Sequence, residues 1–112
     1  MRNLKFFFLI FTIGALSIAC FLDATRIERE WNRNRGIIED SVAGTATRVE
    51  FEKAHRFFFN LTGIAAPVGS DYVGTFPIPE TLDTLRVWDL WYQQNRHRLR
   101  WDDENSTVKI KE

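Results

Sequence analysis

The stretch Thr81–Trp101 constrains the fold most, because it holds three of the four tryptophans of the chain. On a helix, its large apolar side chains fall on one half of the cylinder: Leu82, Leu85, Trp88, Trp91 and Tyr92. A stripe of this size is stable only when another element covers it, so it indicates a core face first and a binding platform second. We therefore expect a helix over about residues 80–96, with the rest of a small domain packed around it.

A second helix is predicted over residues 48–62, because both of its ends are marked in the sequence. Thr47 and Glu50 have the spacing of a capping box, in which each side chain satisfies the other residue's backbone amide. The apolar positions that follow recur every three or four residues: Phe51, Ala54, Phe58 and Leu61. Gly63 stands where a left-handed residue would end the helix. We expect His55, beside this stripe, to be half-buried and hydrogen-bonded, not catalytic.

Beyond His97 the apolar period changes from 3.6 to 2, which indicates strands. We predict a C-terminal β-hairpin of residues 98–102 and 107–111, joined by a polar turn. One face of this ribbon would be apolar and would lie on the Trp88 face of the helix before it. The fold class is therefore predicted to be α+β: a signal or anchor helix, then two main helices (about 48–62 and 80–96) and the hairpin.

Residues 64–78 are predicted to be a loop, because Pro67, Gly69, Gly74 and Pro77 are too closely spaced for a helix. A connection of this length is often functional or mobile. We expect Tyr72 and Phe76 to pin it to the core. Asp71 and Tyr72 form the polar pair in it that merits consideration as a site.

The start of the chain is typical of a targeting segment. Arg2 and Lys5 precede an apolar run, Phe6–Ile13, and small residues then lead to Cys20, the chain's single cysteine. This arrangement resembles the lipobox of bacterial lipoproteins, in which a diacylglycerol is attached to the cysteine before cleavage. The resemblance implies a signal peptide over residues 1–19 and lipid attachment at Cys20.

Two other interpretations of the leader stay open. An ordinary signal peptidase could cleave after Ala19, or the run Phe6–Leu22 could remain as an uncleaved membrane anchor. In each case the rest of the chain would lie outside the cytoplasm. With the lipid or the uncleaved anchor it would be held at a membrane of the cell envelope, on the non-cytoplasmic side. Because Phe21 and not Asp follows the cysteine, the lipoprotein resemblance implies the outer membrane in a Gram-negative organism.

Residues 20–46 are expected to be the lipidated cysteine and a charged tether, and residues 47–112 a small α+β domain. Ile27 and Trp31 are four residues apart and could share a helical face, but a solvated tether with a frayed helix is the interpretation that we favour from the sequence. Gly36 would end it.

A second resemblance follows from the pattern Trp88-x-x-Trp91-Tyr92-x-x-Asn95-x-x-x-Leu99-x-Trp101-Asp102. It is similar to a segment of small bacterial exported or lipid-anchored proteins of uncharacterised function. It covers 15 of the 112 residues of the chain. This resemblance implies a location and a fold, and it implies no chemistry.

The sequence contains no phosphate-binding loop, metal-ligand spacing or nucleophile motif, so we expect no cofactor, no metal and no catalytic residues. Equal numbers of acidic and basic residues, 15 each, argue against a nucleic-acid partner. The possible binding surface consists of Asp71, Tyr72, Trp91 and Arg96. We expect a membrane-associated binding or structural module with an envelope protein or cell-wall partner. The alternative is a small hydrolase or carbohydrate-binding protein that uses the Asp71/Tyr72 loop and the tryptophan face.

Overall fold

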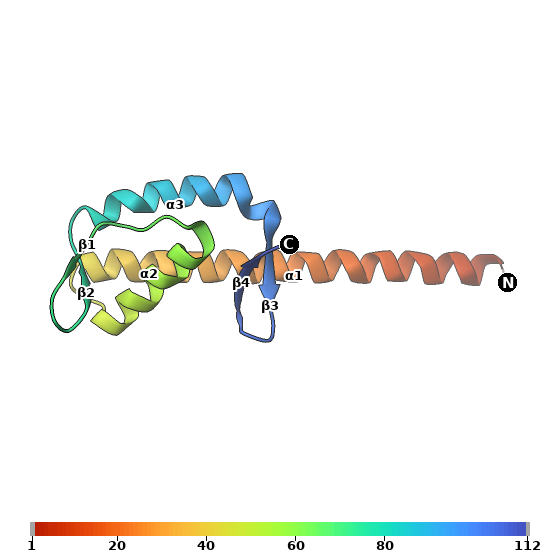
Figure 1. The fold of residues 1–112 in the computed structure, drawn as a ribbon. Coiled ribbons are helices and arrows are strands. Elements are labelled where there is room, and N and C mark those ends of the chain that lie inside the picture. Colours follow the sequence, from red (N-terminus) through yellow and green to blue (C-terminus); the bar gives the residue numbers. More distant parts are fainter. Residues whose placement is uncertain (1, 112) are drawn as a thin grey trace.

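The computed structural model describes the backbone of residues 2–111 and the side chains of residues 21–111. Its elements follow in the order α1 (Arg2–Val42), α2 (Arg48–Thr62), β1 (Val68–Ser70), β2 (Thr75–Pro77), α3 (Thr81–Asn95), the 3-10 turn η1 (Arg96–Arg98), β3 (Leu99–Asp102) and β4 (Thr107–Ile110) (Figure 1). The strands form two separate antiparallel hairpins, β1–β2 and β3–β4. The predicted α+β class is confirmed, as are the two main helices and the C-terminal hairpin.

Helix α2 has the predicted bounds. The Glu50 amide donates to the Thr47 hydroxyl at 3.1 Å, and the Glu50 carboxylate accepts from the Thr47 amide at 3.2 Å. Gly63 ends the helix in the left-handed region, with φ 72°. The four apolar positions of the predicted stripe are all buried: Phe51, Ala54, Phe58 and Leu61.

Helix α3 buries Trp88 completely, as its stripe predicts. The Trp88 ring stacks on Phe58, with 4.3 Å between the ring centroids, and its indole N–H donates to the Ile64 carbonyl at 2.9 Å. The prediction for Leu82 is wrong, since 40% of this residue is exposed. The buried face of α3 is turned toward Thr84, so the helix presents Leu82 to solvent.

The largest difference from the sequence-based expectations is in α1. The charged stretch that was expected to be a tether is helical and has one buried face. The buried residues recur at alternating intervals of four and three: Ile27, Trp31, Asn34, Ile38 and Ser41. Gly36 lies inside the helix and does not end it. The first main element of the domain is therefore the second half of α1.

Polar residues in the buried stripe of α1 explain why the sequence did not reveal it. The Asn34 amide donates to the Glu30 carbonyl at 2.9 Å, and the Ser41 hydroxyl donates to the Ile37 carbonyl at 2.7 Å. Both groups are therefore satisfied within their own helix, and they can be buried without a partner elsewhere.

Trp31 of α1 contacts both of the other helices. Its ring contacts Phe58 of α2 edge to face, with 4.8 Å between centroids. It stacks on Tyr92 of α3 at 4.6 Å. Aromatic pairs in these geometries stabilise a core beyond the area that they bury. The tryptophan of the expected tether is thus at the centre of the core.

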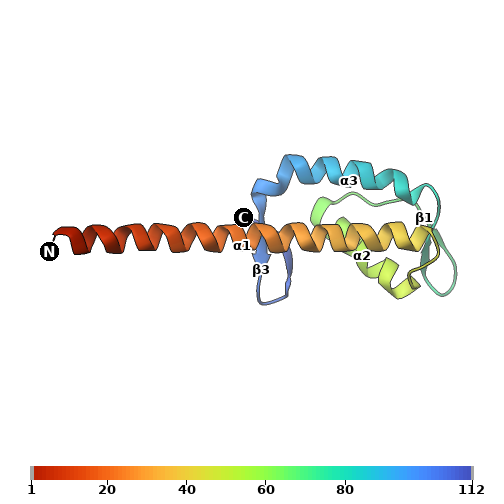
Figure 2. The ribbon, with the colours of Figure 1, turned by 180° about the vertical axis from the view of Figure 1, so that it is seen from behind.

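The β3–β4 hairpin has the predicted register, with Leu99 opposite Ile110 and Trp101 opposite Val108. Leu99 and Val108 are buried. The expected cover is wrong, because the hairpin packs mainly on α1 and on α2, and not on the Trp88 face of α3 (Figures 1 and 2). The η1 turn carries the chain from α3 back across α1, and this places the ribbon there.

Residues 64–78 are not structureless, since they contain the short β1–β2 hairpin. A Cβ atom at Gly69 would overlap the Phe76 ring, so any larger residue there would displace that ring. Phe76 is partly buried, and the Arg48 guanidinium lies 5.6 Å from its ring centroid. Tyr72 is fully exposed at the hairpin tip, so the expectation that it pins the loop is wrong.

The N-terminal part of α1 extends beyond the other elements (Figure 1). The β3–β4 end of the domain is nearest to this extension, and the β1–β2 hairpin is at the opposite end. Within the part of the chain that the structure describes, no helix has the length and apolar character needed to cross a membrane. The predicted signal peptide and the Cys20 side chain lie outside the described side chains.

Candidate functional site

The four residues of the predicted binding surface lie in two separate places. Asp71 and Tyr72 are at the tip of the β1–β2 hairpin, whereas Trp91 and Arg96 are near the C-terminal end of α3, at the other end of the domain (Figure 1). The structure therefore does not bring them together into one site.

Asp71 organises its own hairpin. Its carboxylate accepts from both terminal nitrogens of Arg48, at 2.7 and 3.1 Å. It also accepts from the backbone amides of Val73 and Gly74, at 2.9 and 3.1 Å. The Arg48 hydrogen bond is the main cause that lowers the pKa of Asp71 to about 2, with the two amides adding to it. A carboxylate held in this way suits a turn and is a poor general base near neutral pH.

Trp91 is half-buried and stacks on Trp31, with 6.4 Å between the ring centroids and 8° between the planes. It therefore belongs to the edge of the core. Arg96 is exposed just after α3, where it borders a small hollow together with Glu28 and Tyr92.

His55 has the structural role that its position predicts. It is half-buried, and its Nε2 atom accepts a hydrogen bond from the Ala66 amide at 3.2 Å. Burial is the main cause that lowers the pKa of His55. The neutral ring thus ties α2 to the chain that follows it.

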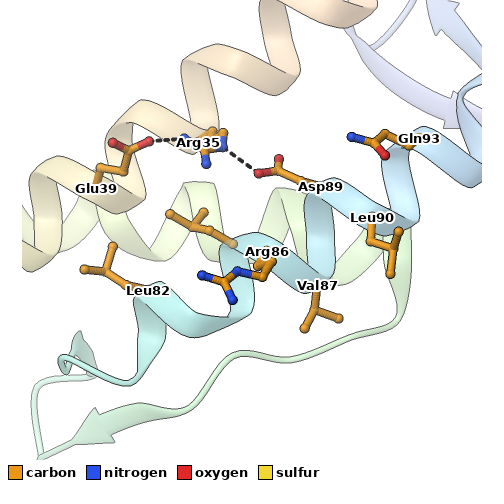
Figure 3. Close-up of a pocket in the computed structure, with 9 residues that line it drawn as sticks. Arg35, Glu39, Leu82, Arg86, Val87, Asp89, Leu90 and Gln93 are labelled. Atoms are coloured by element: carbon orange, nitrogen blue, oxygen red, sulfur yellow. Dashed lines mark hydrogen bonds and ion pairs between the residues drawn. The ribbon is translucent and has the colours of Figure 1, made fainter.

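An open groove of about 770 Å³ lies between the outer face of α3 and α1 (Figure 3). Three apolar side chains of α3 line it and remain substantially exposed: Leu82 (40%), Val87 (48%) and Leu90 (55%). Arg86 lies among them and brings a positive charge to the same face. Apolar groups gathered next to charged ones are typical of surfaces that contact proteins.

A charged network forms the α1 side of this groove. The Arg35 Nε atom donates to Asp89 at 2.9 Å, and Arg35 also pairs with Glu39 on α1 (Figure 3). Asp89 accepts a second hydrogen bond, at 3.2 Å, from the indole N–H of Trp31. Because the buried Trp31 donates this hydrogen bond, the Asp89 side chain is held in place in the free protein. The groove suits an amphipathic protein segment.

Sequence reasoning missed this groove for an identifiable reason. It assigned Leu82 to the core, whereas Leu82, Arg86 and Leu90 follow each other at intervals of four on the solvent side. That repeat is the local signal that could have found the face. The contact of Asp89 with Arg35 joins residues 54 positions apart, so nothing local predicts it.

No family model matches this chain, and neither a curated protein nor a solved structure matches it. Among the side chains of residues 21–111, no three His, Cys, Asp or Glu residues are grouped so that they could hold a metal ion.

Proposed function

We propose that this protein is exported, anchored at the cell envelope membrane by its N-terminal segment, and acts there as a non-enzymatic binding or structural module. The observation that carries the proposal is the leader. Arg2 and Lys5 precede the apolar run Phe6–Leu22, and Cys20 follows a series of small residues. In this proposal Cys20 carries the lipid, and an uncleaved anchor is the other way of holding the chain at the membrane.

The continuity of α1 supports the structural half of this proposal. Helix α1 continues without a break from the residues next to Cys20 into the core, where Ile27, Trp31 and Ile38 are buried. A domain joined in this way is held close to the membrane in a fixed orientation, whereas a flexible linker would let it reach a larger volume.

The surface features support a protein partner over a substrate. Asp71 is bound by Arg48, and Trp88 is buried, so the hydrolase or carbohydrate alternative loses its acid and one ring of its tryptophan face. The groove on α3 offers exposed Leu82, Val87 and Leu90 beside charges that are already in place. We assign this groove to an envelope protein partner.

Fractionation of cells that produce the full chain tests the anchoring. We expect the wild-type protein with the membranes, and Cys20→Ser either released or stalled before processing. Ile18→Ser, which changes the leader but leaves the cysteine in place, serves as the control. Retention of Cys20→Ser with an unchanged mass would favour the uncleaved anchor. Wild-type protein in the soluble fraction would overturn the proposal.

Site-specific photocrosslinking in cells tests the groove. A photoreactive residue at Leu90, 55% exposed on α3, should yield one adduct of defined mass. The matched control is Phe59, which is 47% exposed on α2 and outside the groove. Equal crosslinking at both positions, or none at Leu90, would contradict the assignment.

A further inference from the structure

The end of the domain that is nearest to the N-terminal part of α1 carries exposed cations. They come from η1, from β3 and from the residue after β4: Arg96, Arg98, Arg100 and Lys111. None of the four forms an ion pair with an acidic side chain in the described range of residues 21–111. We name these four residues the cationic end.

Two carboxylates of α1 face the cationic end. Asp23 and Glu28 border a hollow of about 390 Å³ together with Arg96, Arg100 and Lys111. This shared hollow places the cations beside the first turns of α1 that follow the apolar run. Figures 1 and 2 show the same proximity, with η1 and β3 next to α1 where its extension begins.

The remaining charges near this end largely offset one another. Arg26 pairs with Asp103 at 3.2 Å, and Lys109 pairs with Asp102 at 2.7 Å. Glu104 lies in the β3–β4 turn, at the opposite end of β3 from η1. Among the side chains of residues 21–111, the four cations of the cationic end therefore outnumber the two carboxylates, Asp23 and Glu28, that face them.

The position of this charge along α1 matters most. Phe21 and Leu22 complete the apolar run and are 70% and 52% exposed. Since an α-helix rises about 1.5 Å per residue, Asp23 and Glu28 lie within roughly 2–9 Å of Leu22 along the axis. The field of a charged surface extends about 8 Å at physiological ionic strength. Cations at this level are within reach of a membrane surface that meets α1 at Phe21 and Leu22.

On the basis of the proposed anchoring, we propose that the cationic end binds the phosphate groups of anionic phospholipids next to the point where the chain is anchored. Arginine and lysine close to such a surface are attracted by its negative potential. The apolar contact of Phe21 and Leu22 and the charge contact of η1 and β3 would then act on the same side of the domain. The β1–β2 tip, at the other end, would point away from the membrane.

The test uses the full chain reconstituted into vesicles and labelled with an amine-reactive acetylating reagent. One set of vesicles is phosphatidylcholine, and the other also contains phosphatidylglycerol. In the anionic vesicles, we expect acetylation of Lys111 to slow about threefold relative to Lys53, because a surface potential of about −30 mV raises the local proton concentration by that factor. Lys53 is exposed on α2, outside the cationic end, and serves as the internal control. Mass spectrometry measures both rates in the same sample.

Variants and conditions separate the causes. Arg98→Gln with Arg100→Gln should remove most of the protection of Lys111, and Arg56→Gln with Arg86→Gln, away from the cationic end, should leave it intact. Inorganic phosphate added to phosphatidylcholine vesicles should give no protection, which distinguishes a lipid surface from the free ion. Flotation is measured first. Failure to float with either vesicle overturns the anchoring itself, whereas flotation with equal Lys111 rates in both vesicles overturns only the headgroup contact.

Discussion

Helices α1 and α2 both bury aromatic side chains in the core, but only α2 was predicted from local signals in the sequence. Helix α2 has a capping box at Thr47, a regular apolar stripe and a left-handed Gly63. Helix α1 has no comparable local signal within the domain. Its buried stripe includes Asn34 and Ser41, and Gly36 lies in its middle. The difference shows that local signals define where a helix begins and ends, whereas burial depends on what the other elements bring to it.

The contact between the two helices makes them a unit. Trp31 of α1 meets Phe58 of α2 edge to face, and Phe58 in turn stacks on Trp88 of α3. The β3–β4 hairpin covers parts of both α1 and α2. The expected tether is therefore one wall of the core, and the domain does not begin at α2.

The largest expected effect is from removal of β4. Deleting residues 106–112 should unfold the domain, because Leu99 and Trp101 lose their paired strand and α1 loses its cover. Circular dichroism in the near ultraviolet should then lose the signals of the packed tryptophans. A truncated protein that keeps this spectrum and its melting midpoint would show that the hairpin is dispensable and that α1 stays folded without it.

Equal losses of stability on substitution of Trp31 and Phe58 would show that α1 and α2 contribute equally to the core. Either residue changed to Ala should cost on the order of 3–5 kcal/mol in the free energy of unfolding, since both are buried aromatic residues. Because the rings touch, the double variant should lose less than the sum. Urea unfolding measures all three. A Trp31→Ala protein as stable as its parent would return α1 to the role of a tether.

Substitution of two glycines by alanine should change the stability in opposite directions. Gly36→Ala should stabilise the protein by about 0.5–1 kcal/mol, because Gly36 is helical and a Cβ atom there meets nothing within 4 Å. Gly63→Ala should destabilise it by about 1–2 kcal/mol, because its φ of 72° strains any residue with a Cβ atom. Thermal melts resolve both shifts. Destabilisation by Gly36→Ala would indicate that α1 breaks at this residue.

The smallest expected effect concerns the Arg48–Asp71 pair, which ties the β1–β2 hairpin to the first turn of α2. The pKa of Asp71 is lowered in the fold from 3.8 to about 2. Its contribution to stability is therefore complete above pH 4 and is lost as the pH falls through about 2. Asp71→Asn should remove this part of the acid sensitivity and lower the melting midpoint slightly near neutral pH, and the two proteins should converge as the pH falls below about 2. An unaltered acid profile would show that the pair contributes nothing in solution.

Most of the secondary structure of residues 47–111 was predictable because its signals are local. The bounds of α2 follow from Thr47 and Gly63, and the β3–β4 register follows from the alternation around Trp101 and Val108. The cover of the hairpin was not predictable, since the η1 turn decides the direction in which the ribbon crosses α1. No periodicity within residues 98–111 contains that information.

The candidate site was predicted less well than the fold. The groove depends on the contact of Arg35 with Asp89 and on the rotation of α3 that exposes Leu82, and both are set by long-range packing. Asp71, a candidate site residue from the sequence, accepts hydrogen bonds from the Val73 and Gly74 amides of its own hairpin. Its partner Arg48 is 23 positions away, so its use in holding the hairpin could not be foreseen.

Hydrogen–deuterium exchange of the full chain tests the central claim most directly, namely that α1 is part of the folded core. The amides between Trp31 and Ser41 should exchange as slowly as those between Phe51 and Leu61, because both segments open only when the shared core opens. The result that would contradict the account is exchange of the α1 segment within seconds while α2 stays protected. Residues 21–46 would then behave as a solvated tether, and the domain would begin at α2.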